Sequence, residues 1–243
     1  GKSAFAHKGG IHVSAVMKDS NMYEHIDPKL VGNKQRVLVS DLSGKSNISF
    51  KANELDIKYK DSKEITGKLV SKVKDLEFEG YQFEAADASL ELILRELSGE
   101  YSPFFKVLDS KVHISYDESG TEKADATLKV LVGDDIEHTA SDGDGPVDAL
   151  NNALRKALAM FFPELKDVRL TDYKVRVLNE QEGTGAKVRV LIESAYEDDS
   201  WSTIGVSKNI IEASRQALSD SFNYRLAKLS KWKINNKKSL QLS

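Results

Sequence analysis

The second half of the chain carries one pattern of apolar and polar positions written twice. Two runs in each copy alternate between apolar and polar residues, as half-buried strands do. These runs are residues 111–114 and 126–132 in the first copy, and 174–177 and 186–192 in the second. A third short segment carries Thr139 in the first copy and Thr203 in the second. Each copy is therefore predicted to form three strands.

A helical spacing of apolar residues follows the strands of each copy. The apolar positions recur at intervals of three, four or their sums: Val147, Leu150, Leu154 and Leu158, then Ile211, Leu218, Phe222 and Leu226. Ala149 matches Ala213 and Ala153 matches Ala217, both at an offset of 64 positions. The shared offset favours a duplicated β-β-β-α unit. The alternative is two unrelated α+β segments that look alike because strands alternate with helices.

A β-β-β-α unit has one apolar sheet face and one apolar helix stripe, and it cannot bury both well alone. Two copies are therefore expected to pack against each other. This arrangement is typical of a duplicated binding or dimerisation module. The predicted fold class is α+β, with a small helical subdomain followed by the duplicated β-β-β-α domain.

Two helices are predicted ahead of the duplicated domain. Their apolar positions are Ile65, Leu69, Val73 and Leu76, then Phe83, Ala86, Leu90, Leu94 and Leu97, with Gly80 between them. Residues 98–103 form the clearest linker. Residues 41–48 have the glycine and serine content of a loop but lack the frame of a nucleotide-binding loop. The predicted regions are a first subdomain (1–49), a helical subdomain (50–100), the duplicated domain (104–230) and a basic tail (231–243).

Composition narrows the classes of function. The net charge of the 243 residues is −3, so no field that would gather nucleic acid or an anionic membrane is expected. The chain has no cysteine, which excludes disulfides, thiolate metal sites and a cysteine nucleophile. It has no apolar run of about 18 residues, so no membrane span is expected. The chain begins with Gly1 rather than methionine, and we expect it to be a fragment that lacks an amino-terminal portion.

The first fifty residues hold three histidines, His7, His12 and His25. His7 and His12 flank a Gly9-Gly10 pair, which lets the backbone turn tightly or approach a ligand. The spacing of two metal ligands on one helix face is missing. Hydrogen-bonded histidines are therefore favoured over metal ligands, and no metal site is predicted in this chain.

Three short sequences resemble the segment after the catalytic TIM barrel in the 2-isopropylmalate synthase and citramalate synthase family. They are AFAHKGGIH at residues 4–12, YEHIDPKLVG at 23–32 and LSGKSNI at 42–48. The resemblance extends over essentially the whole chain, because a helical subdomain, a linker and a duplicated regulatory domain follow in the same order. The third sequence, with residues 79–89, is more similar to the citramalate synthase branch.

The resemblance implies that the full protein condenses acetyl-CoA with a 2-oxo acid, using a divalent metal held in the barrel. No cofactor is expected in this chain, and the chain alone is expected to be inactive. The family places His12 and Tyr23 over the barrel mouth, usually that of the partner subunit. These residue types suit the chemistry, since histidine can manage a proton near neutral pH and tyrosine can hydrogen-bond a developing enolate.

The resemblance also implies a cytoplasmic homodimer whose duplicated domain binds the end-product amino acid at the dimer interface. The citramalate-like sequences favour isoleucine and pyruvate; leucine and 2-oxoisovalerate are the rivals. The bound amino acid is expected to act on the barrel through residues 98–103 and then His12 and Tyr23. The effector site and the active site are then linked by a coupling free energy. Two other readings are a dimerisation scaffold without effector and a free-standing amino-acid sensor; the second has no use for His12 and Tyr23.

The residues at the start of the first repeat's helix suit an amino-acid effector. Gly143 and Gly145 permit close backbone approach, and Pro146 suits a first helical turn. Amides at a helix start can hold a carboxylate, while carbonyl groups or Asp144 can meet an ammonium group. The corresponding stretch of the second repeat is taken as 203–207, where Ile204, Gly205 and Val206 can line an apolar pocket. The alternative is that Asp142 or Asp144 merely caps the helix after a glycine turn.

Overall fold

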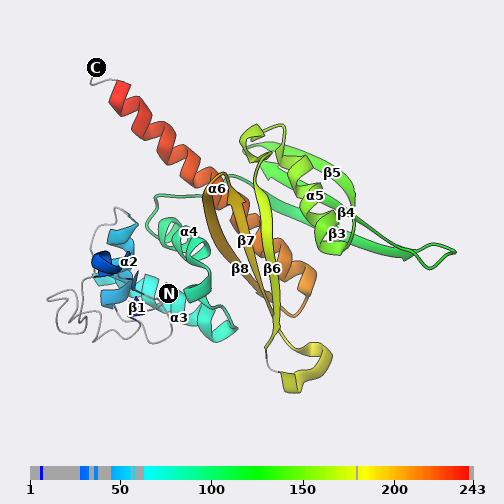
Figure 1. Ribbon diagram of the computed structural model, residues 1–243, viewed down its shortest axis with the longest axis horizontal. Helices are drawn as coiled ribbons and strands as arrows, with labels where there is room; N and C mark the ends of the chain where they lie inside the picture. The colour runs from blue at the N-terminus through cyan, green and yellow to red at the C-terminus, as the bar shows by residue number, and fades with distance from the viewer. Residues whose placement is uncertain are drawn as a thin grey trace. The chain divides into compact units, whose positions relative to one another are not determined.

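The computed structural model describes residues 6–7, 28–32, 36–37, 45–55, 57, 63–178 and 180–240. The chain divides between Tyr101 and Ser102 into two compact units, and the division lies inside the predicted linker. Figure 1 shows the helices of the first unit and the two sheets of the second. No helix in the described part of the chain combines the length and the hydropathy that a membrane crossing needs.

The first unit is mainly helical. Its elements are β1 (Ala6–His7) paired in parallel with β2 (Arg36–Val37), the 3-10 turns η2 (Pro28–Val31) and η3 (Phe83–Ala85), and the helices α2 (Lys45–Glu54), α3 (Lys63–Glu79) and α4 (Asp87–Leu97). Helices α3 and α4 match the two predicted helices, except that Ala86, at φ −141°, separates η3 from α4. Helix α2 was not predicted, and it runs across the expected boundary at residue 49.

Polar side chains explain why α2 has no clear apolar stripe in the sequence. Asn47 and Lys51 are buried on this helix together with Ile48 and Ala52. The ammonium group of Lys51 lies 3.3 Å from the carboxylate of Glu54 and 3.5 Å from that of Asp87 at the start of α4. A buried lysine paired in this way is tolerated because its charge is balanced.

The second unit confirms the two predicted β-β-β-α repeats. The first repeat consists of β3 (Lys106–Tyr116), β4 (Glu122–Val132), β5 (Asp135–Gly143) and α5 (Pro146–Leu158). The 3-10 turn η4 (Pro163–Leu165) leads to the second repeat, which consists of β6 (Arg169–Val177), η5 (Glu180–Gly185), β7 (Val188–Tyr196), β8 (Asp199–Ser207) and α6 (Ile210–Leu240). Each sheet is antiparallel, in the order β3-β4-β5 or β6-β7-β8.

Strand register confirms that the two sheets are built alike. Ala124 lies opposite Gly143 in the first sheet, and Val188 lies opposite Ser207 in the second, which keeps the offset of 64 positions. The outer strands also share a β-bulge, which leaves Leu108 unpaired in β3 and Thr171 unpaired in β6. Unrelated α+β segments have no reason to share both the register and the bulge.

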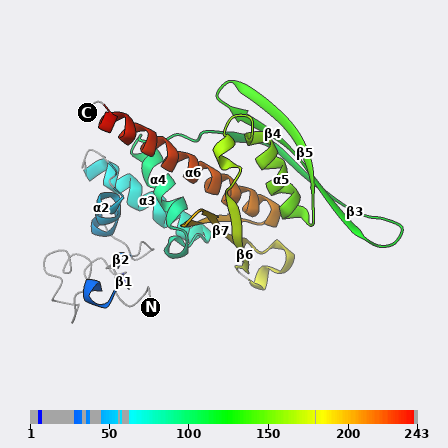
Figure 2. The ribbon, with the colours of Figure 1, turned by 45° about the horizontal axis from the view of Figure 1, so that its top comes forward.

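Each helix covers the two later strands of its own sheet. Helix α5 packs on β4 and β5, and α6 packs on β7 and β8, while the two helices touch each other (Figure 2). The core between helix and sheet is formed by apolar residues that are at most 2 % exposed, among them Ala126, Leu128, Leu150, Leu154, Val190, Ile192, Leu218 and Phe222. The edge strands β3 and β6 are left largely outside this cover.

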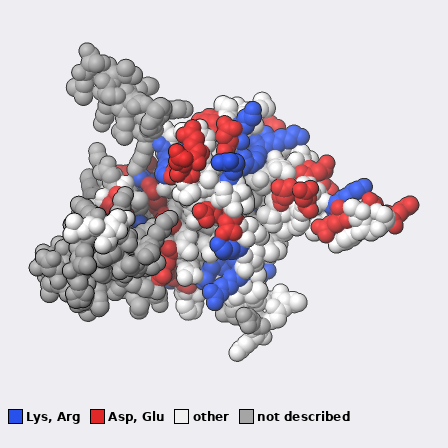
Figure 3. Space-filling model, viewed as in Figure 1, with Lys and Arg blue, Asp and Glu red and all other residues white. Residues whose placement is uncertain are grey.

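Charges on the surface of the second unit are mixed. Figure 3 shows acidic and basic side chains interspersed over this unit on the face that it presents. This distribution agrees with the small net charge and gives no large field of one sign on that face.

Candidate functional site

The turn between β5 and α5 gathers the predicted residues Gly143 to Pro146. Gly145 is the N-cap residue of α5 in an extended conformation, and Pro146 begins the helix, as the sequence predicted. The first intrahelical hydrogen bond runs from the Ala149 amide to the Gly145 carbonyl at 2.9 Å. The amides of Val147 and Asp148 therefore belong to the first turn, where a helix has no acceptor of its own.

Asp148 and Asn152 hold this turn in shape. The carboxylate of Asp148 accepts hydrogen bonds from the Asp144 amide at 3.1 Å and from the Asn152 side chain at 3.2 Å. The same Asn152 amide group donates to the Asp142 carbonyl at 3.2 Å. The alternative in which Asp142 or Asp144 caps the helix is wrong, because Gly145 is the N-cap and no side chain caps it. The sequence analysis missed Asp148, although an acidic residue in a first helical turn is a recognisable signal.

In the second repeat, a side chain caps the start of the corresponding helix, α6. Asn209 stands 64 positions after Gly145, and its side-chain oxygen accepts a hydrogen bond from the Ile211 amide at 2.9 Å. Its carbonyl accepts from the Ala213 amide, also at 2.9 Å. Since asparagine is a strong N-cap and glycine has no side chain, α6 is self-capped while α5 is open to an external acceptor.

Two glycines bring strands close to helices. A Cβ atom on Gly143 would lie 2.2 Å from the Ala149 nitrogen, and one on Gly205 would lie 2.0 Å from the Ala213 carbonyl oxygen. The close approach predicted at Gly143 therefore serves packing against α5 of the same repeat. At Gly145 a Cβ atom would meet nothing within 4 Å, so this glycine leaves open space at the helix start.

The correspondence predicted for the second repeat is wrong in register. Because Gly143 matches Ser207, the counterpart of residues 143–146 is residues 207–210 and not 203–207. Ile204 and Val206 are 1 % and 9 % exposed, and they lie on the face of β8 opposite Thr203, which contacts α6. The structure thus places Ile204 to Val206 in a different sheet from the β5–α5 turn.

Half-exposed apolar residues line the same position of both edge strands. Ile114 in β3 is 45 % exposed and Val177 in β6 is 47 % exposed. Ile114 pairs with Ala124 and Val177 pairs with Val188, so both side chains lie on the face of the sheet that the helix covers. Their neighbours on this side include Tyr116 in β3 and Val175 in β6, which are also exposed. We name these four residues the edge stripe. The alternation of apolar and polar residues in β3 and β6 predicted that each strand has an apolar face. It did not predict that the helices leave this face of the two strands uncovered.

The predicted catalytic residues His12 and Tyr23 lie outside the described residues. Among the residues that are described, no group of three or more histidine, cysteine, aspartate or glutamate side chains is placed to hold a metal ion.

The duplicated sheet-and-helix domain coincides with a known family of domains. Residues 84–226 match the LeuA allosteric (dimerisation) domain, and residues 1–80 match the homocitrate synthase post-HMGL domain-like family. The chain belongs to the LeuA allosteric (dimerisation) domain family.

Curated relatives confirm the resemblance to citramalate synthases. The chain is 52 % identical over 233 residues to the (R)-citramalate synthase of Geobacter sulfurreducens and 50 % identical over 229 residues to that of Aquifex aeolicus. These matches cover 94 % of this chain and 43 % of each relative. A 2-isopropylmalate synthase of Methanocaldococcus jannaschii is 28 % identical over 233 residues. The chain therefore spans less than half the length of the curated relatives it matches.

Proposed function

We propose that this chain is the accessory and allosteric region of an acyltransferase that condenses acetyl-CoA with pyruvate to give citramalate, with isoleucine as feedback inhibitor. The similarity to several citramalate synthases supports the reaction. The match to an allosteric domain supports the regulation. The observation that carries the effector site is the uncapped start of α5 at Gly145, set against the self-capped start of α6 at Asn209.

The proposed effector site uses the β5–α5 turn for the charged groups of the amino acid. Its carboxylate accepts from the first-turn amides of α5, where the helix dipole also favours an anion. Its ammonium group meets the exposed carboxylate of Asp144 or nearby carbonyl groups. Asp148 keeps the turn in place through the Asp144 amide.

The apolar wall of the site is assigned to the edge stripe rather than to Ile204 and Val206. Those two residues are almost fully buried, whereas the edge stripe is exposed and occurs in both repeats. In a homodimer, the edge stripe of one protomer covers apolar surface of the other, which gives a branched side chain a dry contact. Effector binding then favours one arrangement of the dimer, and the coupling to the barrel is expected to be about 1–3 kcal/mol.

The catalytic part of the proposal concerns residues outside the described structure. His12 and Tyr23 are proposed to complete the active site over the barrel of the partner subunit in the cytoplasmic full-length enzyme. The barrel is proposed to hold the divalent metal, and this chain alone is expected to give no turnover.

Calorimetric titration with isoleucine, leucine and valine tests the effector site. Saturable binding of isoleucine in preference to leucine supports the citramalate assignment, and preference for leucine moves the assignment to 2-isopropylmalate synthase. A ligand at a hundredfold excess over its Kd also raises stability by about 2.7 kcal/mol. If a folded dimer binds none of the three, the domain is a dimerisation scaffold.

The variant Gly145→Asn locates the site. It copies the self-capped start of α6 onto α5, so we expect it to weaken isoleucine binding while the helix stays folded. Gly120→Asn is the matched control, because Gly120 lies in the β3–β4 turn at φ +80°, where asparagine is tolerated and a Cβ atom meets nothing within 4 Å. Equal isoleucine affinity in the two variants would remove the β5–α5 turn from the site.

A further inference from the structure

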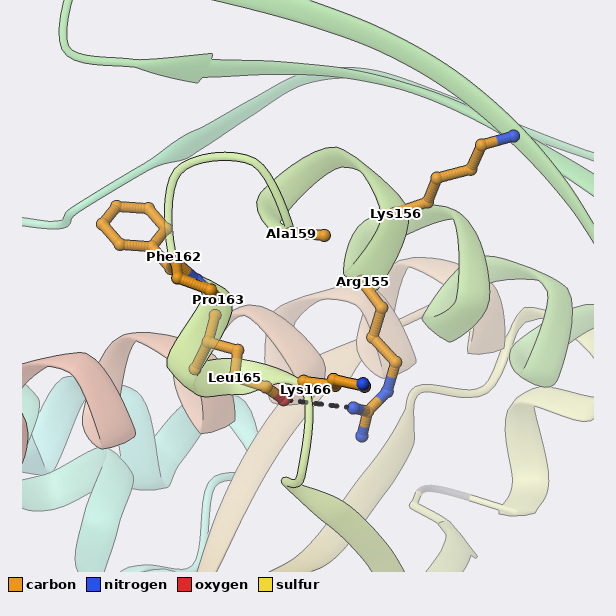
Figure 4. A pocket seen from close by; sticks show the side chains of 7 residues that line it. All are labelled: Arg155, Lys156, Ala159, Phe162, Pro163, Leu165 and Lys166. Carbon is orange, nitrogen blue, oxygen red and sulfur yellow. Dashed lines mark hydrogen bonds between the residues drawn. The ribbon is translucent and has the colours of Figure 1, made fainter.

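A pocket of 360 Å³ lies at the carboxyl end of α5, whereas the proposed effector site lies at the amino end of that helix. Its walls come from the last turns of α5 and from the connector that contains η4 (Figure 4). Ala159, Pro163 and Leu165 give it apolar walls, and Arg155 and Lys166 bring positive charge. Lys156 also lines the pocket but points away toward β5, where it donates to the Ala140 carbonyl at 3.1 Å.

Arg155 is a partly buried cation that contacts only neutral groups. Its guanidinium donates to the Asn151 side chain at 3.3 Å, to the Leu165 carbonyl at 3.4 Å and to the Val168 carbonyl. It also lies 5.2 Å from the ring centre of Phe222. Among the described residues no carboxylate forms an ion pair with it, and burial lowers the pKa of its guanidinium. The lining of the pocket contains no aspartate or glutamate.

A pocket of 590 Å³ lies beside α6, and its other walls come from residues 103–107 and from Leu131 and Gly133 of the first repeat. The helix residues of the two pockets match at the offset of 64 positions, namely Arg155, Lys156 and Ala159 in the first and Ser219, Asp220 and Asn223 in the second. In the second pocket Arg215 is paired with Glu212 at 2.6 and 2.7 Å, and the lining holds the carboxylate of Asp220 as well as the ammonium group of Lys106. Arg215 stands one helical turn before Ser219, the residue that matches Arg155, and unlike Arg155 it has its own counter-ion in Glu212.

We propose that the first-repeat pocket binds a short branched organic carboxylate that carries no ammonium group. The carboxylate lies between Arg155 and Lys166, and the branched body lies against Ala159, Pro163 and Leu165. An anion supplies the counter-charge that no described carboxylate gives to Arg155, and charge-assisted hydrogen bonds to a guanidinium are strong. An amino acid is disfavoured because the lining has no carboxylate for its ammonium group, and the Leu165 carbonyl already accepts from Arg155. The volume is at the small end of the range for ligand pockets.

The probe is 4-methylpentanoate, followed by calorimetry and by the backbone amide NMR signals of Ala159, Leu165 and Lys166. We expect saturable binding with shifts at these amides, and no saturation with the neutral isostere 4-methylpentan-1-ol. Lys166→Glu is expected to weaken binding about tenfold or more, since it turns an attraction into a repulsion. Lys129→Glu makes the same change of charge at an exposed position of the same repeat, and it is expected to leave binding unchanged.

Two variants distinguish this site from the effector site: one fills the pocket, and the other caps the start of α5. Ala159→Leu occupies the pocket from an exposed position and is expected to abolish binding of 4-methylpentanoate. Gly145→Asn is expected to leave that binding unchanged, whatever it does to isoleucine. The proposal is overturned if 4-methylpentanoate does not bind, if the alcohol binds as well, or if Lys166→Glu and Lys129→Glu have equal effects.

Discussion

The hydroxyl group of Thr139 in β5 donates a hydrogen bond of 2.9 Å to the carbonyl of Ala153 in α5. Thr203 in β8 makes the same bond, at 2.8 Å, to the carbonyl of Ala217 in α6. Both pairs are separated by 14 positions and both hydroxyls are buried. The same threonine thus joins each helix to its sheet by a buried hydrogen bond inside an apolar layer, and α6 adds further buried bonds between Ser221 and both Ser194 and Trp201.

Replacing Thr203 by valine is expected to destabilise the second unit by about 1 kcal/mol, because a buried hydrogen bond is lost while the Ala217 carbonyl keeps its place in the helix. Chemical denaturation followed by tryptophan fluorescence measures this, since both tryptophans lie in the second unit. Thr171→Val is the matched control: its hydroxyl donates to the Glu193 carbonyl at 3.2 Å but is exposed, and its loss is expected to cost less than about 0.5 kcal/mol. Equal losses in both variants would show that burial of the Thr203 bond does not matter.

Gly143→Ala and Gly205→Ala are each expected to lower the free energy of unfolding by about 1–3 kcal/mol, because the new methyl group meets helix backbone that must move away. Gly185→Ala is the control, since its Cβ atom meets nothing within 4 Å. The same denaturation experiment compares the three. If Gly143→Ala is as stable as Gly185→Ala, the close approach of β5 to α5 is not required for packing.

The pair of Glu212 and Arg215 predicts a dependence of stability on pH. Hydrogen bonds from Arg215 are the main cause that holds the pKa of Glu212 below its usual value of 4.5. A lowered pKa in the folded state gives stability that is present above pH 4.5 and is lost as the pH falls through the folded pKa. The pair is partly exposed, so its contribution at pH 7 is expected to be at most about 1 kcal/mol.

Denaturation of the natural chain and of Glu212→Gln between pH 3 and pH 7 measures this contribution. The difference in stability between the two is expected to shrink toward zero below pH 4.5. Glu118→Gln removes the same charge at an exposed site and corrects for net charge. A difference that stays constant with pH would mean that the pair contributes nothing through ionisation.

Charged substitutions in the edge stripe test the homodimer. Ile114→Glu and Val177→Glu place a charge on apolar surface that the dimer is proposed to cover, so both are expected to shift the chain toward a monomer in sedimentation experiments. Lys111→Glu changes a residue of β3 that is 78 % exposed and points to the opposite face of the sheet, and it is expected to leave the assembly unchanged. A dimer that persists in both stripe variants would place the interface elsewhere.

The sequence predicted the repeats well because the fold depends on the spacing of apolar side chains, and that spacing is visible at Leu154 and Leu218. It missed α2 because two of the buried positions of this helix are the polar residues Asn47 and Lys51, the latter paired with carboxylates, so no apolar period is visible. The sequence analysis matched residues 203–207 to the β5–α5 turn, because both stretches contain glycine. Strand pairing instead matches Gly143 to Ser207. Arg155 and Lys166 were missed because they meet only when the connector after α5 folds back on the helix.

The bulge shared by β3 and β6 also bears on aggregation. The outer edge of a sheet is a row of amide and carbonyl groups that a strand from another molecule can extend, and repeated extension of this kind produces fibrils. Leu108 and Thr171 interrupt that row on the very strands that carry the edge stripe. A bulge bends its strand and adds twist, so a flat foreign strand cannot follow it. The edge strands can therefore present apolar side chains for association, while the bulged backbone does not accept a further strand.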